Sequence, residues 1–245
     1  MRVPAARLGF GVATVILVRH GRTAANADGI LAGRAAGVRL DEIGREQAAA
    51  VAQRLAMLPL ARVVTSPLQR TVQTAQAVSD AQATPLVPVR DKGLVECGYG
   101  SWTGRTLAEL AKEPLWRTVQ VQPSAVTFPD GEAMADMLSR AVRAVRSHDT
   151  EVAAEHGDGA VWAAVSHGDV IKAIVADALG LHLDAFQRIT VSPASVCVVR
   201  YTAMRPFVAH LNDTGSDLSG LRPQPRRRRR RAKARASDAV VGGGA

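Results

Sequence analysis

The segment Val15-Ile16-Leu17-Val18-Arg19-His20-Gly21 joins an apolar run to three residues of distinctive chemistry. The apolar run predicts a short buried strand. Arg19 offers a planar fork of donors that suits phosphate, and His20 can act as a nucleophile or proton carrier near neutral pH. Gly21 would let backbone N–H groups approach a ligand closely. The segment suggests phosphoryl chemistry, although the tripeptide alone better fits a structural histidine hydrogen-bonded at a strand end.

Two further apolar runs end in polar residues in the same way, one shortly before Arg70 and the other directly before His167. In an open α/β sheet the ligand site lies outside the C-terminal ends of the strands. We therefore expect these three strand ends to bring Arg19, His20, Arg70 and His167 to one place, where all four can donate to an anion.

Strand-like and helix-like segments alternate along most of the chain. The predicted strands are residues 15–18, 62–65, 87–89, 160–165, 196–201 and 207–211, and the predicted helices are 41–57, 68–79, 106–112, 132–154 and 170–179. Residues 21–39 are predicted to form a loop with a short helix, and the last two strands a hairpin. This order predicts an α/β fold, a three-layer sandwich with a mostly parallel central sheet flanked by helices on both faces.

The chain has 245 residues, 47% of them hydrophobic, and a formal net charge of +9. Residues 215–245 hold nine Lys or Arg and two Asp, so seven of those nine net charges lie in this Pro/Arg/Gly/Ala-rich end. Such a composition cannot bury enough apolar surface to fold. We predict an N-terminal extension (1–13), one catalytic domain (14–214) and a disordered basic tail (215–245).

Two cysteines, Cys97 and Cys197, cannot build a disulfide framework or a CxxC metal site. A reducing, cytoplasmic location is therefore expected. No apolar run approaches the length of a membrane span. The basic tail is expected to bind polyanions only weakly, without specific recognition of nucleic acid.

The combination of two arginines and two histidines is what phosphoryl transfer without a metal ion or other cofactor needs. The transition state spreads charge over three equatorial oxygens, which Arg19, Arg70 and one histidine could hold. The other histidine could attack in line, and the nearby arginines should lower its pKa. A leaving alkoxide needs a proton, and Glu96 stands out as its source in a loop rich in glycines and aromatic residues.

At this point the sequence resembles the histidine phosphatase superfamily, in its phosphoglycerate-mutase-like branch. The resemblance spans residues 14–212 and comprises five motifs in the family's order. They are Leu-Val-Arg-His-Gly-Arg-Thr (17–23) with Asn26, Ser-Pro-Leu-Gln-Arg-Thr-Val-Gln-Thr-Ala (66–75), Glu96 before Gly-Ser-Trp-Thr-Gly (100–104), Phe-Pro-Asp-Gly-Glu (128–132) and Ser-His-Gly-Asp (166–169).

The resemblance implies that His20 is the nucleophile that becomes phosphohistidine. It also implies that Glu96 donates a proton to the leaving group and later activates water. The expected substrate-binding residues are Arg19, Gly21, Asn26, Gly33, Arg70 and His167. The expected ligand is a small phosphomonoester, and a homodimer would be compatible with the family.

Several residues carry weaker expectations. Arg22 stands where members of the family often carry Glu or Gln, and Thr103 stands where phosphatase members often carry Glu. Both departures put the substrate preference in doubt. Glu132 and Asp169 are each interpreted as first-turn residues of a helix, where an acid is stabilising. The aromatic residues Tyr99, Trp102 and Trp116 are expected to pack more than to line a substrate cleft.

Three functions remain open. The first is a phosphatase, in which water hydrolyses the phosphohistidine. The second is a phosphoglycerate mutase, but Cys97-Gly98-Tyr99-Gly100 stands where glycolytic mutases carry Arg-His-Tyr-Gly. The third, a non-catalytic phosphate-binding module, has no need of both a nucleophile and an acid. The pattern favours the phosphatase.

Overall fold

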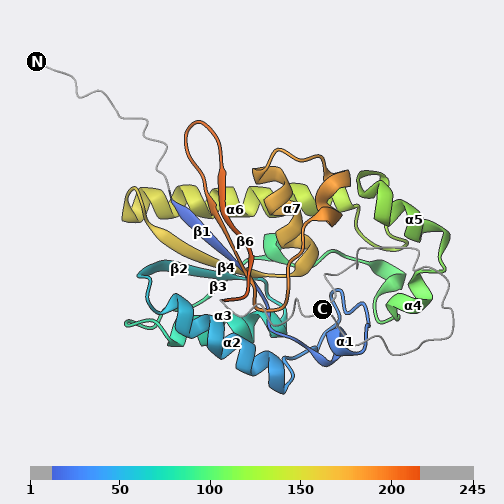
Figure 1. The fold of residues 1–245 in the computed structure, drawn as a ribbon, viewed down its shortest axis with the longest axis horizontal. Coiled ribbons are helices and arrows are strands. Elements are labelled where there is room, and N and C mark those ends of the chain that lie inside the picture. The colour runs from blue at the N-terminus through green and yellow to red at the C-terminus, as the bar shows by residue number, and fades with distance from the viewer. Residues whose placement is uncertain (1–12, 216–245) are drawn as a thin grey trace, which may run out of the picture.

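A six-stranded sheet forms the centre of the computed structural model, which describes residues 13–215 (Figure 1). Its strand order is β3-β2-β4-β1-β5-β6. The strands are β1 (Thr14–Arg19), β2 (Leu60–Thr65), β3 (Val89–Arg90), β4 (Val161–Ser166), β5 (Val196–Arg200) and β6 (Phe207–Asp213). The predicted N-terminal extension and basic tail lie outside the described residues, apart from their innermost positions.

The sheet is mostly parallel, as predicted. Strand β4 lies between β1 and β2 and runs parallel to both, and β3 pairs parallel with β2. Strand β5 runs antiparallel to β1, and β6 antiparallel to β5, which confirms the predicted C-terminal hairpin. Because Arg19 pairs with Ser166, strands β1 and β4 end side by side.

Helices cover both faces of the sheet, which confirms the predicted three layers (Figure 1). The helices are α1 (Ala24–Ala27), α2 (Glu42–Leu55), α3 (Gln69–Asp80), α4 (Leu107–Leu110), α5 (Pro114–Val121), α6 (Met134–His156) and α7 (Gly168–Ala178). Alternate residues of β1 face opposite layers. Val15 and Leu17 join the core beneath α6 and α7, whereas Ile16 and Val18 join the core beneath α2 and α3.

Four 3₁₀ helices lie in the connections: η1 (Lys92–Leu94), η2 (Gly100–Trp102), η3 (Pro123–Ala125) and η4 (Leu183–Arg188). Helix α5, which buries Trp116 and Val119, was not predicted from the sequence. Strand β3 is only two residues long and begins two residues later than predicted. Helix α6 begins at Met134, so Glu132 precedes the helix and is not in its first turn.

Among residues 13–215, no helix combines the length and the apolar character needed to cross a membrane.

Candidate active site

The C-terminal ends of β1, β2 and β4 position the predicted site. Arg19 is the last residue of β1 and His20 follows it, while His167 follows β4 as the N-cap of α7. Arg70 lies in the first turn of α3, just after β2. The backbone of His20 is fixed on both sides, because its N–H donates to Ser166 O (3.0 Å) and its carbonyl accepts from Ala194 N (3.2 Å).

The hydrogen bonds of His20 define one neutral tautomer. Its Nδ1 lies 2.7 Å from the carbonyl oxygen of Gly21, which can only accept, so Nδ1 carries the proton. Its Nε2 lies 3.2 Å from Arg70 Nε, which can only donate, so Nε2 presents its lone pair. Burial, then the charges of Arg70 and Arg19, hold the pKa of His20 well below its usual value. The sequence predicted the effect of the arginines but not that burial is the largest cause.

Arg70 is nearly inaccessible to solvent and keeps an unused donor. Its Nη2 donates to the carbonyl of Gly33 at 2.7 Å, whereas its buried Nη1 has no hydrogen-bond partner among the described residues. An unsatisfied buried donor costs about 1–3 kcal/mol. A charged donor left without a partner beside a histidine lone pair is suited to an anionic ligand.

His167 supplies a second buried polar atom. The two histidine rings meet edge to face, with centroids 5.3 Å apart. Its Nε2 lies 2.8 Å from Ser66 Oγ, while Nδ1 is buried and unpartnered among the described residues. Burial, followed by the charges of Arg70, His20 and Arg19, holds the pKa of His167 well below its usual value.

Arg19 is completely buried and donates from Nη1 to Val191 O at 2.7 Å. Burial lowers its pKa to about 10, against the opposing charges of Glu96 and Asp169. Because this value lies well above neutral pH, Arg19 stays positively charged. The four predicted donors therefore do meet at one edge of the sheet.

Glu96 lies in the same buried region, after η1. Burial, followed by the charge of Asp169, raises its pKa to about 7, although the backbone N–H of Cys97 and the charges of Arg70 and Arg19 lower it. Its Oε1 accepts from Cys97 N at 2.9 Å. A carboxyl group with this pKa can both donate and accept a proton near neutral pH.

Asp169 is fully buried and is more than the first-turn helix residue that the sequence suggested. Its Oδ2 accepts from the hydroxyl of Tyr99 at 2.7 Å, and its Oδ1 lies 3.6 Å from Lys172 Nζ. Sequence reasoning missed this cluster because Tyr99 and Asp169 are 70 residues apart. Its negative charge opposes ionisation of Glu96.

A cavity of about 30 Å³ opens beside these groups. Its lining includes His20, Asn26, Gly33, Arg70 and Glu96. The remaining lining residues are uncharged: Thr23, Ala25, Gly29, Ile30, Leu31, Ala32, Tyr99 and Leu107.

Asn26 and Gly33 line this cavity for identifiable local reasons. Asn26 forms a capping box with Thr23 at the start of α1, in which Oδ1 accepts from Thr23 N at 3.1 Å. Gly33 adopts a positive φ of 49°, and an added Cβ would lie 2.9 Å from Thr103 Oγ1. The turn at Gly33 aims its carbonyl at Arg70.

The structure gives Gly21 a different reason from the one inferred from the sequence. Its N–H donates to Thr74 Oγ1 at 3.2 Å, and an added Cβ would overlap the carbonyl oxygen of Gly44 in α2. Gly44 in turn packs against the carbonyl of Arg22. The close approach that requires glycine at position 21 is therefore between two backbone segments of the protein.

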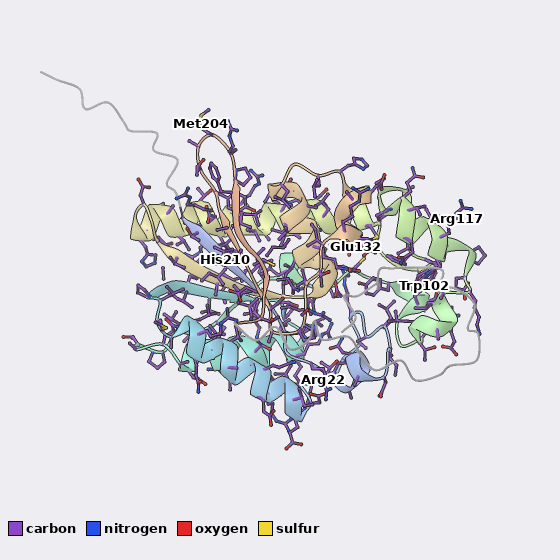
Figure 2. All side chains as sticks on the ribbon, viewed as in Figure 1. Arg22, Trp102, Arg117, Glu132, Met204 and His210 are labelled. Carbon is purple, nitrogen blue, oxygen red and sulfur yellow. The ribbon has the colours of Figure 1, made fainter. Side chains whose placement is uncertain are left out.

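Glu132 was interpreted as a first-turn helix residue, and this interpretation is wrong. Its carboxylate accepts a bidentate pair of bonds from Arg140 and one from Arg34. It also accepts from the backbone N–H of Gly98. Figure 2 shows Glu132 well inside the outline of the molecule, whereas Arg117 and Met204 project from its edge.

The other residues singled out in the sequence have structural contacts. Trp102 and Trp116 stack with centroids 6.2 Å apart, in keeping with a packing role. Arg22 forms an ion pair with Asp41 at 2.8 Å. Burial, then the charges of Glu96 and Asp169, raise the pKa of the Cys97 thiol, so a reactive thiolate is disfavoured.

A family model described as the histidine phosphatase superfamily (branch 1) matches residues 15–214. The chain belongs to this superfamily. The match covers all six strands of the sheet except the first residue of β1, and it includes every residue of the site described above.

Relatives of this chain include the Mycobacterium tuberculosis protein named bifunctional protein Rv2228c, 35% identical over 191 residues, which are 77% of this chain and 50% of that protein. The chain thus spans about half the length of the first relatives it matches. Phosphoserine phosphatase 1 of Hydrogenobacter thermophilus is 31% identical over 206 residues, covering 82% of this chain and 92% of that protein. A Yersinia enterocolitica protein named "Probable phosphoglycerate mutase GpmB" is 33% identical over 189 residues, covering 76% and 84%.

Among solved structures, the chain resembles the mycobacterial glucosyl-3-phosphoglycerate phosphatase Rv2419c in complex with VO3. The TM-score is 0.71 at 26% identity, with 82% of this chain and 98% of that chain covered. The relatives of this chain thus include proteins named as phosphatases and a protein named as a probable mutase, and the solved phosphatase shares its fold.

Proposed function

We propose that this protein hydrolyses small phosphomonoesters through a phosphohistidine on His20, without a metal ion. The observation that carries the proposal is the tautomer of His20, whose Nε2 lone pair faces the buried Arg70 beside two unpartnered polar atoms. A neutral nucleophile next to the unsatisfied charged donor of Arg70 and a second unpartnered polar atom fits the electrostatic needs of a transferring phosphoryl group.

In the first step, His20 Nε2 attacks the phosphorus atom and the bond to the leaving oxygen breaks. Arg19, Arg70 and His167 would hold the phosphoryl oxygens, in exchange for the hydrogen bond that now joins Arg70 to His20. Asn26 would add a donor from Nδ2, because its Oδ1 is engaged by Thr23. Glu96, protonated at and below a pKa of about 7, would give its proton to the leaving alkoxide.

In the second step, a water molecule attacks the phosphohistidine and the bond between Nε2 and phosphorus breaks. Glu96, now ionised, would take the proton of that water. Inorganic phosphate leaves, and both His20 and Glu96 return to their starting protonation states. The raised pKa of Glu96 suits both directions of proton transfer.

A phosphoglycerate mutase is the alternative, supported by the mutase-named relative. Such an enzyme must hold a substrate that carries a carboxylate besides its phosphate. Apart from a tyrosine, the titratable residues that line the cavity, neutral His20 together with Arg70 and Glu96, are all needed at the phosphoryl group and its leaving oxygen. On the neighbouring loops, Arg22 pairs with Asp41 and Arg105 with Glu113, which favours hydrolysis of esters without a carboxylate.

The test is a panel of phosphomonoesters assayed for phosphate release, beside an isomerisation assay with 3-phosphoglycerate, with and without 2,3-bisphosphoglycerate. We expect phosphate release, with kcat/KM higher for glycerol 3-phosphate than for 3-phosphoglycerate. Isomerisation faster than phosphate release would show that the alternative is correct. Release of phosphate from none of the esters, with no isomerisation, would exclude both functions. The expected cytoplasmic location and homodimer stay predictions.

A further inference from the structure

We propose that Glu132, Arg34 and Arg140 form a positioning clasp that holds Glu96 in place for proton transfer to the leaving group. The proposal rests on the function proposed above, because it concerns the residue that would protonate the leaving alcohol. None of the three side chains lines the cavity. They would therefore act through Glu96 and not on the substrate.

The clasp binds Glu96 through hydrogen bonds to its backbone carbonyl. It accepts from Arg34 Nε at 2.8 Å and from Arg140 Nη2 at 3.2 Å. Arg34 comes from the loop before α2, and Arg140 from α6. Two guanidinium groups, one from before Glu96 in the sequence and one from after it, thus hold the same peptide carbonyl.

Glu132 holds both arginines. Its Oε1 accepts from Arg140 Nε at 2.7 Å, and its Oε2 accepts from Arg140 Nη2 at 2.9 Å and from Arg34 Nη2 at 2.7 Å. Bidentate contacts between arginine and carboxylate restrict direction as well as distance. The orientation of each arginine toward Glu96 is therefore set by the same carboxylate.

The clasp also forms hydrogen bonds with the backbone before and after Glu96. Before it, Arg140 Nη1 donates to the carbonyl of Gly93 at 2.8 Å. After it, Gly98 exchanges two bonds with Glu132, donating to Oε2 at 3.1 Å and accepting from the backbone N–H at 2.7 Å. The segment 93–98 consequently has little freedom to move relative to α6.

Such restraint matters because, within the described part of the chain, the Glu96 carboxyl is hydrogen-bonded only by its own segment. Among the described residues, its side-chain hydrogen bond goes to the adjacent N–H of Cys97. The direction of the carboxyl therefore follows the backbone at residues 96–97. A displacement of about 1 Å at a reacting group can cost on the order of a hundredfold in rate.

Arg34 further links the proton donor to the phosphate-binding side of the cavity. The residue before it, Gly33, accepts from Arg70 Nη2 through its carbonyl at 2.7 Å. Two neighbouring residues of one loop thus contact Glu96 on one side and Arg70 on the other. This arrangement would set the distance between the acid and the phosphoryl group.

Glu132 stays negatively charged over the pH range in which Glu96 titrates. Burial alone would raise the pKa of Glu132, but the bonds to Arg140, Gly98 and Arg34 outweigh it and hold the pKa below its usual value. The clasp therefore stays ionised while Glu96 gains or loses its proton near pH 7.

The experiment compares an alkyl ester, butyl phosphate, with an aryl ester, p-nitrophenyl phosphate. An aryl oxide leaves without much help from an acid, whereas an alkoxide needs the proton. The parameter is kcat/KM, which reports the first transfer and not the later hydrolysis. We expect Arg140→Met and Glu132→Gln to lose about tenfold or more on butyl phosphate and less than about threefold on p-nitrophenyl phosphate.

Arg146→Met is the matched control. Arg146 lies on the same helix as Arg140 and pairs with Asp177 at 2.9 Å, away from the Glu96 loop. Its loss removes an ion pair of α6 without touching the clasp, so both esters should keep their wild-type kcat/KM. Activity on the aryl ester also reports whether each variant is folded.

A double variant separates positioning from a general structural role. If the clasp acts through Glu96, adding Arg140→Met to Glu96→Gln will cause no further loss on butyl phosphate. Equal losses on both esters, or losses that add to those of Glu96→Gln, would overturn the proposal.

The outcomes also separate this proposal from the function on which it rests. If the wild-type protein hydrolyses neither ester, the proposed function fails. If the wild-type protein is active and Glu96→Gln impairs only the alkyl ester, while the clasp variants impair both esters equally, the clasp alone fails.

Discussion

Arg70 Nε donates a hydrogen bond to His20 Nε2 across 3.2 Å, inside the protein. The acceptor of this bond is the nitrogen that must attack phosphorus in the proposed reaction. It also places a fixed positive charge against the imidazole, which opposes its protonation. Burial is the largest cause that keeps the nucleophile neutral, and Arg70 adds to it while presenting a further, unpartnered donor, Nη1, beside the ring.

Removal of Arg70 should therefore change the titration of His20. In Arg70→Met we expect the pKa of His20 to rise, because a nearby positive charge no longer opposes the imidazolium. NMR titration of the ring nitrogens measures this directly. Phosphoester kcat/KM should fall by about a hundredfold or more, since a phosphoryl contact is lost as well. An unchanged His20 pKa would contradict the electrostatic role of Arg70.

The pKa of Glu96, about 7, predicts a basic limb in the pH profile. For butyl phosphate, kcat/KM should fall about tenfold per pH unit above pH 7, because the acid has lost its proton. The profile for p-nitrophenyl phosphate should be flatter, and Glu96→Gln should abolish the limb. A limb of equal steepness with both esters would assign the titration to another group.

The same carboxyl should make stability depend on pH. Its pKa rises from 4.5 to about 7 on folding. The stabilisation is therefore complete below pH 4.5 and is lost as the pH rises through 7. At about 1.4 kcal/mol per pKa unit, the difference between the two ends is on the order of 3 kcal/mol.

The glutamine of Glu96→Gln does not titrate, so only the wild-type protein loses this stabilisation. The free energy of unfolding of the variant, relative to that of the wild-type protein, should therefore rise by about that amount between pH 4.5 and pH 8. Urea unfolding at the two pH values measures the difference. A constant gap between the two proteins would show that folding does not raise the pKa of Glu96.

Gly21→Ala distinguishes two reasons for a glycine after the nucleophile. An added Cβ would overlap the carbonyl of Gly44, so we expect a loss of about 1–3 kcal/mol of stability, measured by thermal or urea unfolding. If the glycine instead serves ligand approach, the variant will keep its stability and lose substrate binding.

The sequence was sufficient to place the four strand-end donors, because each follows a short apolar run. His20, Arg70 and His167 end up together as a consequence of parallel strands that finish at one edge. The motif around Glu96 likewise pointed to a loop beside them. These predictions needed only local pattern and the usual topology of parallel sheets.

The contacts that hold the site could not be predicted, because they join residues far apart in the chain. Glu132 lies 98 residues from its partner Arg34 and 34 residues from Gly98. The packing of Gly21 on Gly44 depends on how closely α2 approaches the end of β1. No element was predicted for the eight residues of helix α5, which is short and begins at a proline.

The most direct test of the central claim is to trap the phosphorylated protein. After brief exposure to p-nitrophenyl phosphate and a rapid quench, mass spectrometry at neutral to alkaline pH should find an acid-labile phosphoryl group on His20. His210→Ala, which removes an exposed histidine, should be labelled like the wild-type protein, whereas His20→Ala should be unlabelled and inactive. Unchanged turnover by His20→Ala, or a phosphoryl group on another residue, would contradict the account.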